Sequence, residues 1–417
     1  MRGPPTERRR VTALNFFPAF VPPASGGELR CYHVYKNLGR YYQIDLVTPQ
    51  FGLPETVPLA DNVVERRWSK TRWHHRLHRW FERIGHFPEC SAMVVSLASH
   101  RDRDFRTLVK KLSLGSDIIV HEFPFLYRHA RKRRGQLLVY DAHNVEFDLQ
   151  RAMLKGPLGA LLCRYAWWLE WLVCRDSDVV FATSSDDRRR LIELYGVAPD
   201  KVFVAPNGVD VEAVTPASPT ERVDARRRLA LEGEDVLLFV GSFHPPNIEA
   251  VECLITSVAP RLPDKLFVIA GNVARNVEAA RLPKNVVWLD HVSDGVKTLL
   301  LQAADVALNP MFSGSGTNLK MLEYLAAGVP VVTTAIGARG LDLVDGEHAI
   351  VCPVEEFPRQ IGRVLRDDAL RATLRAEGRR LVERAYDWTR IVEAMHAAIE
   401  AALAAEGDGH RSRRLPR

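Results

Sequence analysis

The chain has 417 residues, of which 47% are hydrophobic and 26% are charged, and its formal net charge is +6. This length exceeds what one hydrophobic core usually supports, so we expect two domains, and the ordinary composition excludes a fibrous or largely disordered protein. The positive charge favours anionic partners, but it does not distinguish a sugar nucleotide from a phospholipid surface or a nucleic acid.

Cysteine usage and the N-terminal segment favour a cytoplasmic protein. The cysteines are scattered and form no Cys-x-x-Cys pair, which predicts free thiols. They are Cys31, Cys90, Cys163, Cys174, Cys253 and Cys352. Residues 1–10 are basic, and prolines interrupt the apolar stretch after them too early for a signal peptide, so we predict a disordered N-terminus and no export. The most apolar helical stretch, 161–174, is too short to span a bilayer.

Short apolar runs alternate with amphipathic stretches over residues 11–205, a pattern typical of a parallel α/β sheet. We predict strands at 11–17, 44–48, 117–121, 137–141 and 179–183. Together they indicate an N-terminal Rossmann-like domain. A turn and a charged, proline-containing stretch follow, and we place the interdomain linker at 206–235.

A second alternating series occupies residues 236–385 and indicates a C-terminal Rossmann-like domain. We predict its strands at 236–241, 266–270, 286–289, 306–310, 331–334 and 350–352. We expect a helix at 386–404 to pack back toward the N-terminal domain and the polar tail, 405–417, to be disordered. The predicted fold class is α/β, with two doubly wound parallel-sheet domains facing an interdomain cleft.

The most informative segment is the glycine-rich turn that begins at Ser313 and leads into a short helix and a buried strand. Free backbone N–H groups and the positive end of the helix dipole favour an anion at such a helix start, and glycines allow the anion to approach the backbone. Lys320 adds a positive charge, and Glu323 can accept hydrogen bonds from a ribose diol. The ordered combination predicts a cradle for a nucleotide-linked phosphate.

Further motifs lie at predicted strand ends and turns. They are Gly26-Gly27, Asp141-x-His143-Asn144, the run 177–184, the turn 204–210, Phe239-Val240-Gly241-Ser242 and Lys320-x-x-Glu323-Tyr324-Leu325-Ala326. By these residues nearly the whole chain resembles glycosyltransferase family 4, whose members have the two-domain fold called GT-B. The resemblance implies a retaining, metal-independent transferase. It would move a sugar from a UDP-, GDP- or similar nucleoside-diphosphate donor to a glycan or lipid-linked acceptor, in cell-surface polysaccharide or glycolipid biosynthesis.

The resemblance also implies roles for individual residues. His143 would contact the reacting sugar, Asp141 would orient the His143 ring, and Lys320 would offset charge on the leaving diphosphate. The implied donor-binding residues are Gly26, Gly27, Ser242, Asn247, His291, Gly314, Ser315, Gly316, Thr317, Asn318, Leu319 and Glu323. No metal ligand or cofactor is expected, and the N-terminal domain would bind the acceptor. A strand-end pair, His121–Glu122, is as compatible with a structural role as with a functional one.

Two positions depart from the family pattern. Ser315 stands where members commonly have a glutamate that contacts the sugar hydroxyls, which leaves sugar recognition open. Many relatives also have an Arg and a Lys after the first strand of the second domain, whereas residues 242–247 have no full positive charge here. We expect Lys320 to compensate.

The stretch from Arg66 to Arg83 has the spacing of a basic amphipathic helix. Its apolar face consists of Trp73, Leu77, Trp80, Phe81 and Ile84. Such a helix can lie on anionic lipid, with its aromatic rings in the interface. Alternatively, the aromatic face packs on its own sheet and the arginines are solvated.

Other function classes remain open at this point. A sugar-nucleotide epimerase has the same architecture, and Ser315 together with the missing cations makes a noncatalytic nucleotide- or glycan-binding module conceivable. Nucleic-acid binding is not expected, because only the basic charge balance favours it.

Overall fold

The computed structural model describes residues 8–21, 23, 25–85, 87, 89–273, 282–313 and 316–412, with side chains as far as residue 405. The chain forms two compact units. The first consists of the residues up to Pro206 together with those from Ile391 onward, and the second is Asn207–Arg390.

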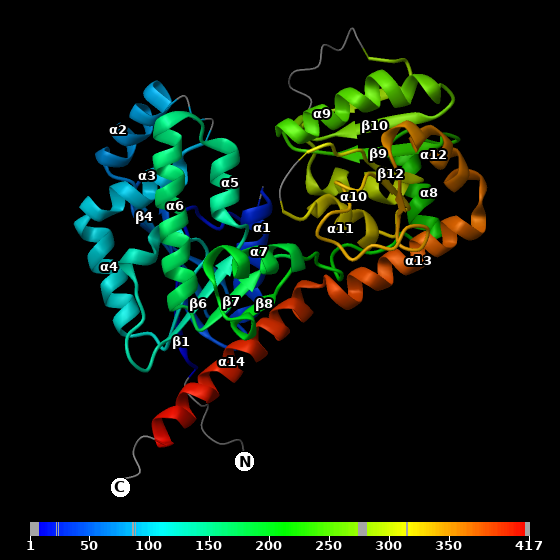
Figure 1. The fold of residues 1–417 in the computed structure, drawn as a ribbon. Helices are drawn as coiled ribbons and strands as arrows, with labels where there is room; N and C mark the ends of the chain where they lie inside the picture. Colours follow the sequence, from blue (N-terminus) through cyan, green and yellow to red (C-terminus); the bar gives the residue numbers. More distant parts are fainter. Residues whose placement is uncertain are drawn as a thin grey trace. The chain divides into compact units, whose positions relative to one another are not determined.

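The described part of the first unit contains an eight-stranded sheet in the order β3-β4-β2-β1-β5-β6-β7-β8 (Figure 1). Its strands are β1 (Arg10–Leu14), β2 (Gln43–Gln50), β3 (Glu55–Ala60), β4 (Val63–Ser69), β5 (Ile118–His121), β6 (Leu137–Ala142), β7 (Val179–Ala182) and β8 (Val202–Val204). Neighbouring strands are parallel except the edge strand β3, which pairs with β4 in the antiparallel direction. Every residue of β5, β6 and β7 is buried, as expected for a parallel sheet covered by helices.

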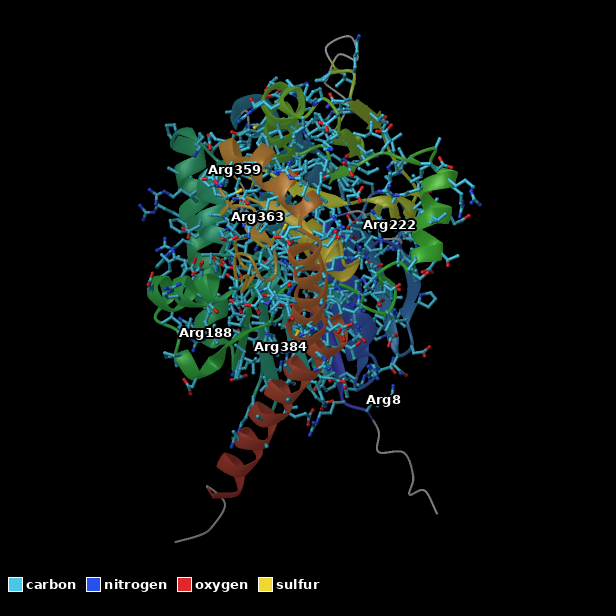
Figure 2. All side chains as sticks on the ribbon, turned by 90° about the vertical axis from the view of Figure 1, so that its right-hand side faces the viewer. Arg8, Arg188, Arg222, Arg359, Arg363 and Arg384 are labelled. Atoms are coloured by element: carbon cyan, nitrogen blue, oxygen red, sulfur yellow. The ribbon has the colours of Figure 1, made fainter. Side chains whose placement is uncertain are left out.

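Helices cover the faces of this first sheet. They are α1 (Gly26–Leu38), α2 (Arg72–Trp80), α3 (Ser91–Ala98), α4 (Arg103–Leu114), α5 (Glu146–Met153), α6 (Gly156–Asp176) and α7 (Ser185–Tyr195). Arg188 of α7 fixes the edge strand β8, because its Nε donates to the Val202 carbonyl at 2.7 Å (Figure 2).

The long helix α14 (Trp388–Ser412) belongs to the first unit from Ile391 onward. Its His396 ring stacks on Tyr41, with ring centroids 3.8 Å apart, and the Tyr42 hydroxyl lies 2.8 Å from His396 Nδ1. Glu400 accepts hydrogen bonds from Tyr42 at 3.0 Å and from Arg9 at 2.5 Å. The helical backbone continues to Ser412, past the predicted end at residue 404.

Where the structure describes it, the second unit contains a six-stranded parallel sheet in the order β11-β10-β9-β12-β13-β14. Its strands are β9 (Val236–Val240), β10 (Leu266–Ala270), β11 (Val286–Leu289), β12 (Val306–Asn309), β13 (Val331–Thr333) and β14 (Ile350–Val351). Its helices are α8 (Pro219–Arg228), α9 (Pro245–Cys253), α10 (Asp294–Ala303), α11 (Leu319–Ala326), α12 (Phe357–Arg366) and α13 (Asp368–Ala385). The two sheets confirm the predicted fold class of doubly wound parallel α/β domains.

The segment predicted as a linker, 206–235, contains helix α8, which is part of the second unit. Arg222 of α8 donates to the Ala304 carbonyl at 2.7 Å and to Asp305 Oδ1 at 2.5 Å (Figure 2). Ser218 caps the helix and Pro219 begins it, a combination that favours a helix start.

The prediction of one helix from Arg66 to Arg83 is wrong over its first part. Residues up to Ser69 form strand β4, in which Arg66 and Trp68 lie on one face while Glu65 and Arg67 lie on the other. Both arginines have acidic partners: Arg66 Nε lies 2.6 Å from Asp45 on the neighbouring strand β2, and Arg67 Nη2 lies 2.8 Å from Glu65, two positions earlier on β4 itself. The helix itself, α2, begins only at Arg72.

Candidate functional site

In the second unit, the start of helix α11 follows the carboxyl end of β12, where the glycine-rich turn was predicted to bind an anion. Gly316 has a φ of 67°, which favours glycine, and Asn318 precedes the helix without capping it through its side chain. Thr317 Oγ1 is buried and has no hydrogen-bond partner among the described residues. Gly314 and Ser315, predicted to bind the donor, lie outside the described residues. The Met321 N–H donates to the Asn318 carbonyl at 3.0 Å, so the Leu319 and Lys320 N–H groups and this hydroxyl are those available to an acceptor ligand.

Lys320 connects α11 to the loop that follows β9. Its Nζ donates to Asn247 Oδ1 at 2.7 Å and lies 4.1 Å from the centroid of the Phe239 ring. Asn247 Nδ2 in turn donates to the Ser242 carbonyl at 3.0 Å. Desolvation lowers the pKa of Lys320 to about 7, although nearby Glu323 acts in the opposite direction. An anion beside this lysine would favour its charged form.

Glu323 points toward a lysine that the sequence reasoning did not identify. Its Oε1 accepts a hydrogen bond from Lys297 Nζ of α10 at 2.7 Å, and both side chains are partly exposed. The Tyr324 hydroxyl, next along α11, accepts the Val240 N–H at 2.8 Å and so links α11 to the end of β9. These contacts place Glu323, Lys320, Asn247 and Ser242 around the start of one helix.

The remaining predicted donor-binding residues of this unit lie in different surroundings. Asn318 Nδ2 donates to Asn309 Oδ1 at 3.3 Å, and Leu319 packs against the hydrophobic core. His291 is exposed beyond the end of β11, and among the described residues it forms no hydrogen bond with the group around Lys320.

In the first unit, Gly26 and Gly27 are the first residues of α1 and not part of a loop. Ser25 caps the helix by accepting the Glu28 N–H, and the Glu28 carboxylate accepts the Ser25 N–H. A Cβ on Gly27 would lie 2.9 Å from the Phe17 ring, so a larger residue there would require that ring to shift. The first-turn amides at Gly26 and Gly27 lack intrahelical acceptors and can donate to an anion.

His143 lies just beyond the end of β6 and pairs with Glu122, just beyond the end of β5. Its Nε2 is 2.7 Å from Glu122 Oε2, and the Tyr35 hydroxyl donates to Glu122 Oε1. Burial raises the pKa of Glu122 to about 7, and burial lowers the pKa of His143 to about 3. The His143 imidazole is therefore neutral at pH 7 and its orientation is fixed by a carboxyl group.

The expectation that Asp141 orients His143 is not supported, because the Asp141 carboxylate is engaged by Arg30. Arg30 donates to its two oxygens at 3.2 and 2.5 Å, and to the Ala205 carbonyl at 2.9 Å. Desolvation raises the pKa of Asp141, while the Arg30 guanidinium opposes this effect. One ligand atom each from Glu122, Asp141 and His143 lies within 4.8 Å of the others. The Arg30 guanidinium already binds the Asp141 carboxylate, so its positive charge neutralises the negative charge of that carboxylate.

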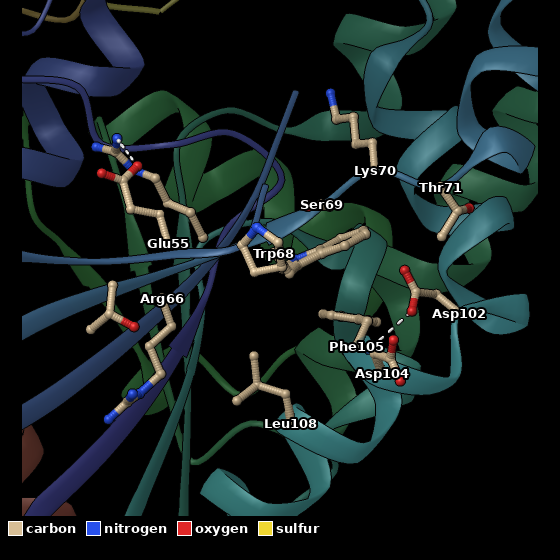
Figure 3. A pocket seen from close by; sticks show the side chains of 13 residues that line it. Glu55, Arg66, Trp68, Ser69, Lys70, Thr71, Asp102, Asp104, Phe105 and Leu108 are labelled. Atoms are coloured by element: carbon tan, nitrogen blue, oxygen red, sulfur yellow. Dashed lines mark hydrogen bonds and ion pairs between the residues drawn. The ribbon is translucent and has the colours of Figure 1, made fainter. Parts of the chain in front are cut away.

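A separate cavity of about 450 Å³ lies in the first unit beside β4 and the start of α4 (Figure 3). Trp68 and Phe105 line it, with Arg66 and Lys70 contributed from the β4 segment and Asp104 from α4. It contains none of the predicted site residues, and its lining carries both signs of charge.

Comparisons with known proteins agree with the fold and with the motifs. Two family models match the chain: Glycosyltransferase Family 4 over residues 24–213, and Glycosyl transferases group 1 over residues 234–367. A D-inositol 3-phosphate glycosyltransferase of Geodermatophilus obscurus is 30% identical over 292 residues, which cover 66% of this chain and 63% of the relative. A phosphatidyl-myo-inositol mannosyltransferase of Mycobacterium tuberculosis is 30% identical over 223 residues, covering 51% of this chain and 57% of the relative. The chain thus spans about three fifths of the length of these curated relatives.

Among solved structures, Anabaena HepE in complex with UDP-glucose has a TM-score of 0.67 and 15% identity, covering 94% of this chain and 100% of that chain. The chain has two α/β units built on parallel sheets, and in the second unit a helix start that can bind an anion follows β12. These features and the likeness to HepE place the chain in the class of GT-B proteins. The chain is a glycosyltransferase of the family 4-like type with the GT-B fold, which confirms the resemblance found in the sequence.

Proposed function

We propose that this protein is a retaining, metal-independent glycosyltransferase that moves a sugar from a nucleoside-diphosphate donor to a glycan or lipid-linked acceptor. The observation that carries the proposal is the group at the start of α11, where Lys320, Asn247 and Glu323 accompany a buried Thr317 hydroxyl that has no partner among the described residues. Family membership, the UDP-glucose bound by HepE and the inositol-containing acceptors in the relatives' names support it.

In this proposal the second unit stabilises the leaving group. The diphosphate gains negative charge as the glycosidic bond breaks, so fixed donors aimed at it lower the barrier. The α11 amides supply such donors, and Lys320 becomes fully protonated as the anion approaches. Lys320 thereby replaces the cations that residues 242–247 lack. Glu323 accepts a ribose hydroxyl, and the neutral His143 of the first unit contacts the reacting sugar.

A donor screen is the first test. Thermal unfolding would be measured with UDP-, GDP-, ADP- and dTDP-linked sugars, because a ligand that binds the folded state raises its apparent stability. The donor that binds would then be incubated alone and with acceptors. Isomerisation of the donor sugar without acceptor would favour an epimerase instead, and binding without any turnover would favour a noncatalytic module.

The Glu323→Ala variant tests the site itself. A charge-assisted hydrogen bond contributes about 1.5–3 kcal/mol, so kcat/KM for the donor should fall about 10- to 100-fold. The control is Glu252→Ala, which removes an exposed glutamate from α9. Near-normal kcat/KM in Glu323→Ala would contradict the assignment.

We further propose that the protein acts at the cytoplasmic face of the membrane, in cell-surface glycan or glycolipid synthesis, through α2 and the short π-helix Phe81–Gly85 that follows it. Trp73, Trp80 and Ile84 are 47%, 44% and 59% exposed, whereas Phe81 is buried. Four arginines are exposed beside them: Arg72, Arg76, Arg79 and Arg83. Exposed indoles among cations favour the lipid interpretation over packing on the sheet. Among the described residues, no helix combines the length and the apolar character needed to cross a bilayer.

A further inference from the structure

We propose that Lys297 is a positioning residue for nucleotide recognition, which holds the Glu323 carboxylate so that a single oxygen accepts the ribose. The proposal rests on the proposed function, since it assumes that a nucleoside diphosphate binds at the start of α11. Both residues lie in the second unit, Lys297 on α10 and Glu323 on α11.

The geometry divides the two carboxylate oxygens. Lys297 Nζ lies 2.7 Å from Glu323 Oε1, while Glu323 Oε2 accepts no hydrogen bond from the described residues. A lysine ammonium is a compact charge with three donors and no acceptor. It can therefore fix a carboxylate oxygen by donating to it, but it cannot itself accept a hydrogen bond from a ribose hydroxyl. Oε2 is therefore the oxygen that remains for a ligand hydroxyl.

The partial burial of Lys297 and Glu323 makes their ion pair relevant to ligand binding. The Lys297 side chain is 30% exposed and that of Glu323 is 23% exposed, so both are reachable by a ligand without being freely mobile. Fixing a flexible glutamate before binding removes the cost of ordering it during binding. In addition, the positive charge of Lys297 offsets the repulsion that a bare carboxylate would exert on an incoming diphosphate. Lys297 should thus act on nucleotide affinity and on the contribution of the ribose hydroxyls to it.

The test compares nucleotides that differ in one hydroxyl. Dissociation constants of UDP and GDP and of their 2′-deoxy and 3′-deoxy forms would be measured by calorimetry for wild type and for Lys297→Met, Lys297→Arg and Lys265→Met. Lys265 is the matched control because its Nζ lies 2.7 Å from Asp235, at the amino end of β10 and away from α11. Thermal unfolding of each variant verifies that it is folded.

We expect wild type to lose about tenfold in affinity when one of the two ribose hydroxyls is removed. Lys297→Met should bind the parent nucleotide about tenfold more weakly and lose less than about threefold on the same deletion. Lys297→Arg should recover most of the discrimination, and Lys265→Met should behave as wild type. Equal discrimination in wild type and Lys297→Met would overturn the inference alone. If no nucleoside diphosphate binds wild type, the proposed function fails and the inference fails with it.

Discussion

The hydrogen bond between His143 and Glu122 joins two buried groups whose pKa values burial moves in opposite directions. Because burial raises the pKa of Glu122 to about 7, this carboxyl ionises near neutral pH. Its negative charge favours positive charge developing on a sugar held by His143, so kcat should rise as pH increases through about 7. We predict that Glu122→Gln lowers kcat about tenfold and removes this rise.

Saturating donor is needed in that measurement, because Lys320 also titrates near pH 7 and would alter donor binding. Tyr35→Phe is the control variant. The Tyr35 hydroxyl lowers the pKa of Glu122, so its removal should move the inflection in kcat to higher pH without abolishing it. A pH profile of Glu122→Gln that keeps the wild-type inflection would show that another group is responsible.

The sequence identified some residues of the site but not their partners. Glycine at a helix start, and Lys320 three residues before Glu323, are local patterns that can be recognised from the amino-acid sequence alone. Arg30 and Lys297 lie in amphipathic helices, where a charged residue normally faces water. Their partners, Asp141 and Glu323, are 111 and 26 positions away along the chain, so only the tertiary structure reveals those pairs.

At the scale of elements, predicted and observed structure differ most where charges occupy a strand. The predicted bounds of strands 266–270 and 286–289 match the observed ones, because both strands are continuous apolar runs, as is typical of parallel sheets. By contrast β4, which carries Glu65, Arg66 and Arg67, was not predicted, and neither were the two edge strands β3 and β8. Ion pairs that neutralise a strand cannot be recognised from periodicity alone.

Helix α2 is the element on which membrane contact is expected to depend. We predict that Arg76→Glu with Arg79→Glu reduces binding to vesicles containing anionic phospholipid about tenfold or more, because each cation near such a surface contributes about 1 kcal/mol. Arg227→Glu with Arg228→Glu on α8 makes the same change in net charge at exposed positions of the second unit. Sedimentation with vesicles at low and high salt measures the effect. Equal loss in both double variants would mean that net charge, and not α2, controls binding.

At the scale of the whole molecule, the first unit contains buried titratable groups that the alternating α/β pattern does not reveal. Burial lowers the pKa of four histidines to about 3 or 4: His74, His121, His129 and His143. Unfolded histidine has a pKa of about 6.5. As pH falls below this value the unfolded chain binds protons that the folded unit does not, so this stabilisation is complete above about pH 6.5 and is lost toward pH 4.

Buried carboxyl groups of the first unit act in the opposite direction, and Glu122 and Glu146 are the clearest examples. Burial raises the pKa of Glu122 to about 7 and that of Glu146 to about 8. The folded unit therefore holds protons that unfolded glutamates release above about pH 4.3, and the corresponding stability decreases as pH rises through about 7 to 8. The two sets together predict an apparent Tm of the first unit that is highest near pH 6.5 and falls on both sides.

Single variants separate the two sides of this Tm profile, the acid limb below about pH 6.5 and the alkaline limb above it. His121→Gln keeps a donor for the Ala130 carbonyl, which His121 Nε2 contacts at 2.8 Å, but it cannot titrate, so the acid limb should become shallower. The slope would change by up to about 1.4 kcal/mol per pH unit, the value for one proton. Glu146→Gln should flatten the alkaline limb instead. Thermal unfolding followed by tryptophan fluorescence between pH 5 and 8 reports mainly on the first unit, which contains Trp68, Trp73, Trp80, Trp167, Trp168 and Trp171. If both variants keep both wild-type limbs, these buried groups do not control the stability of the unit.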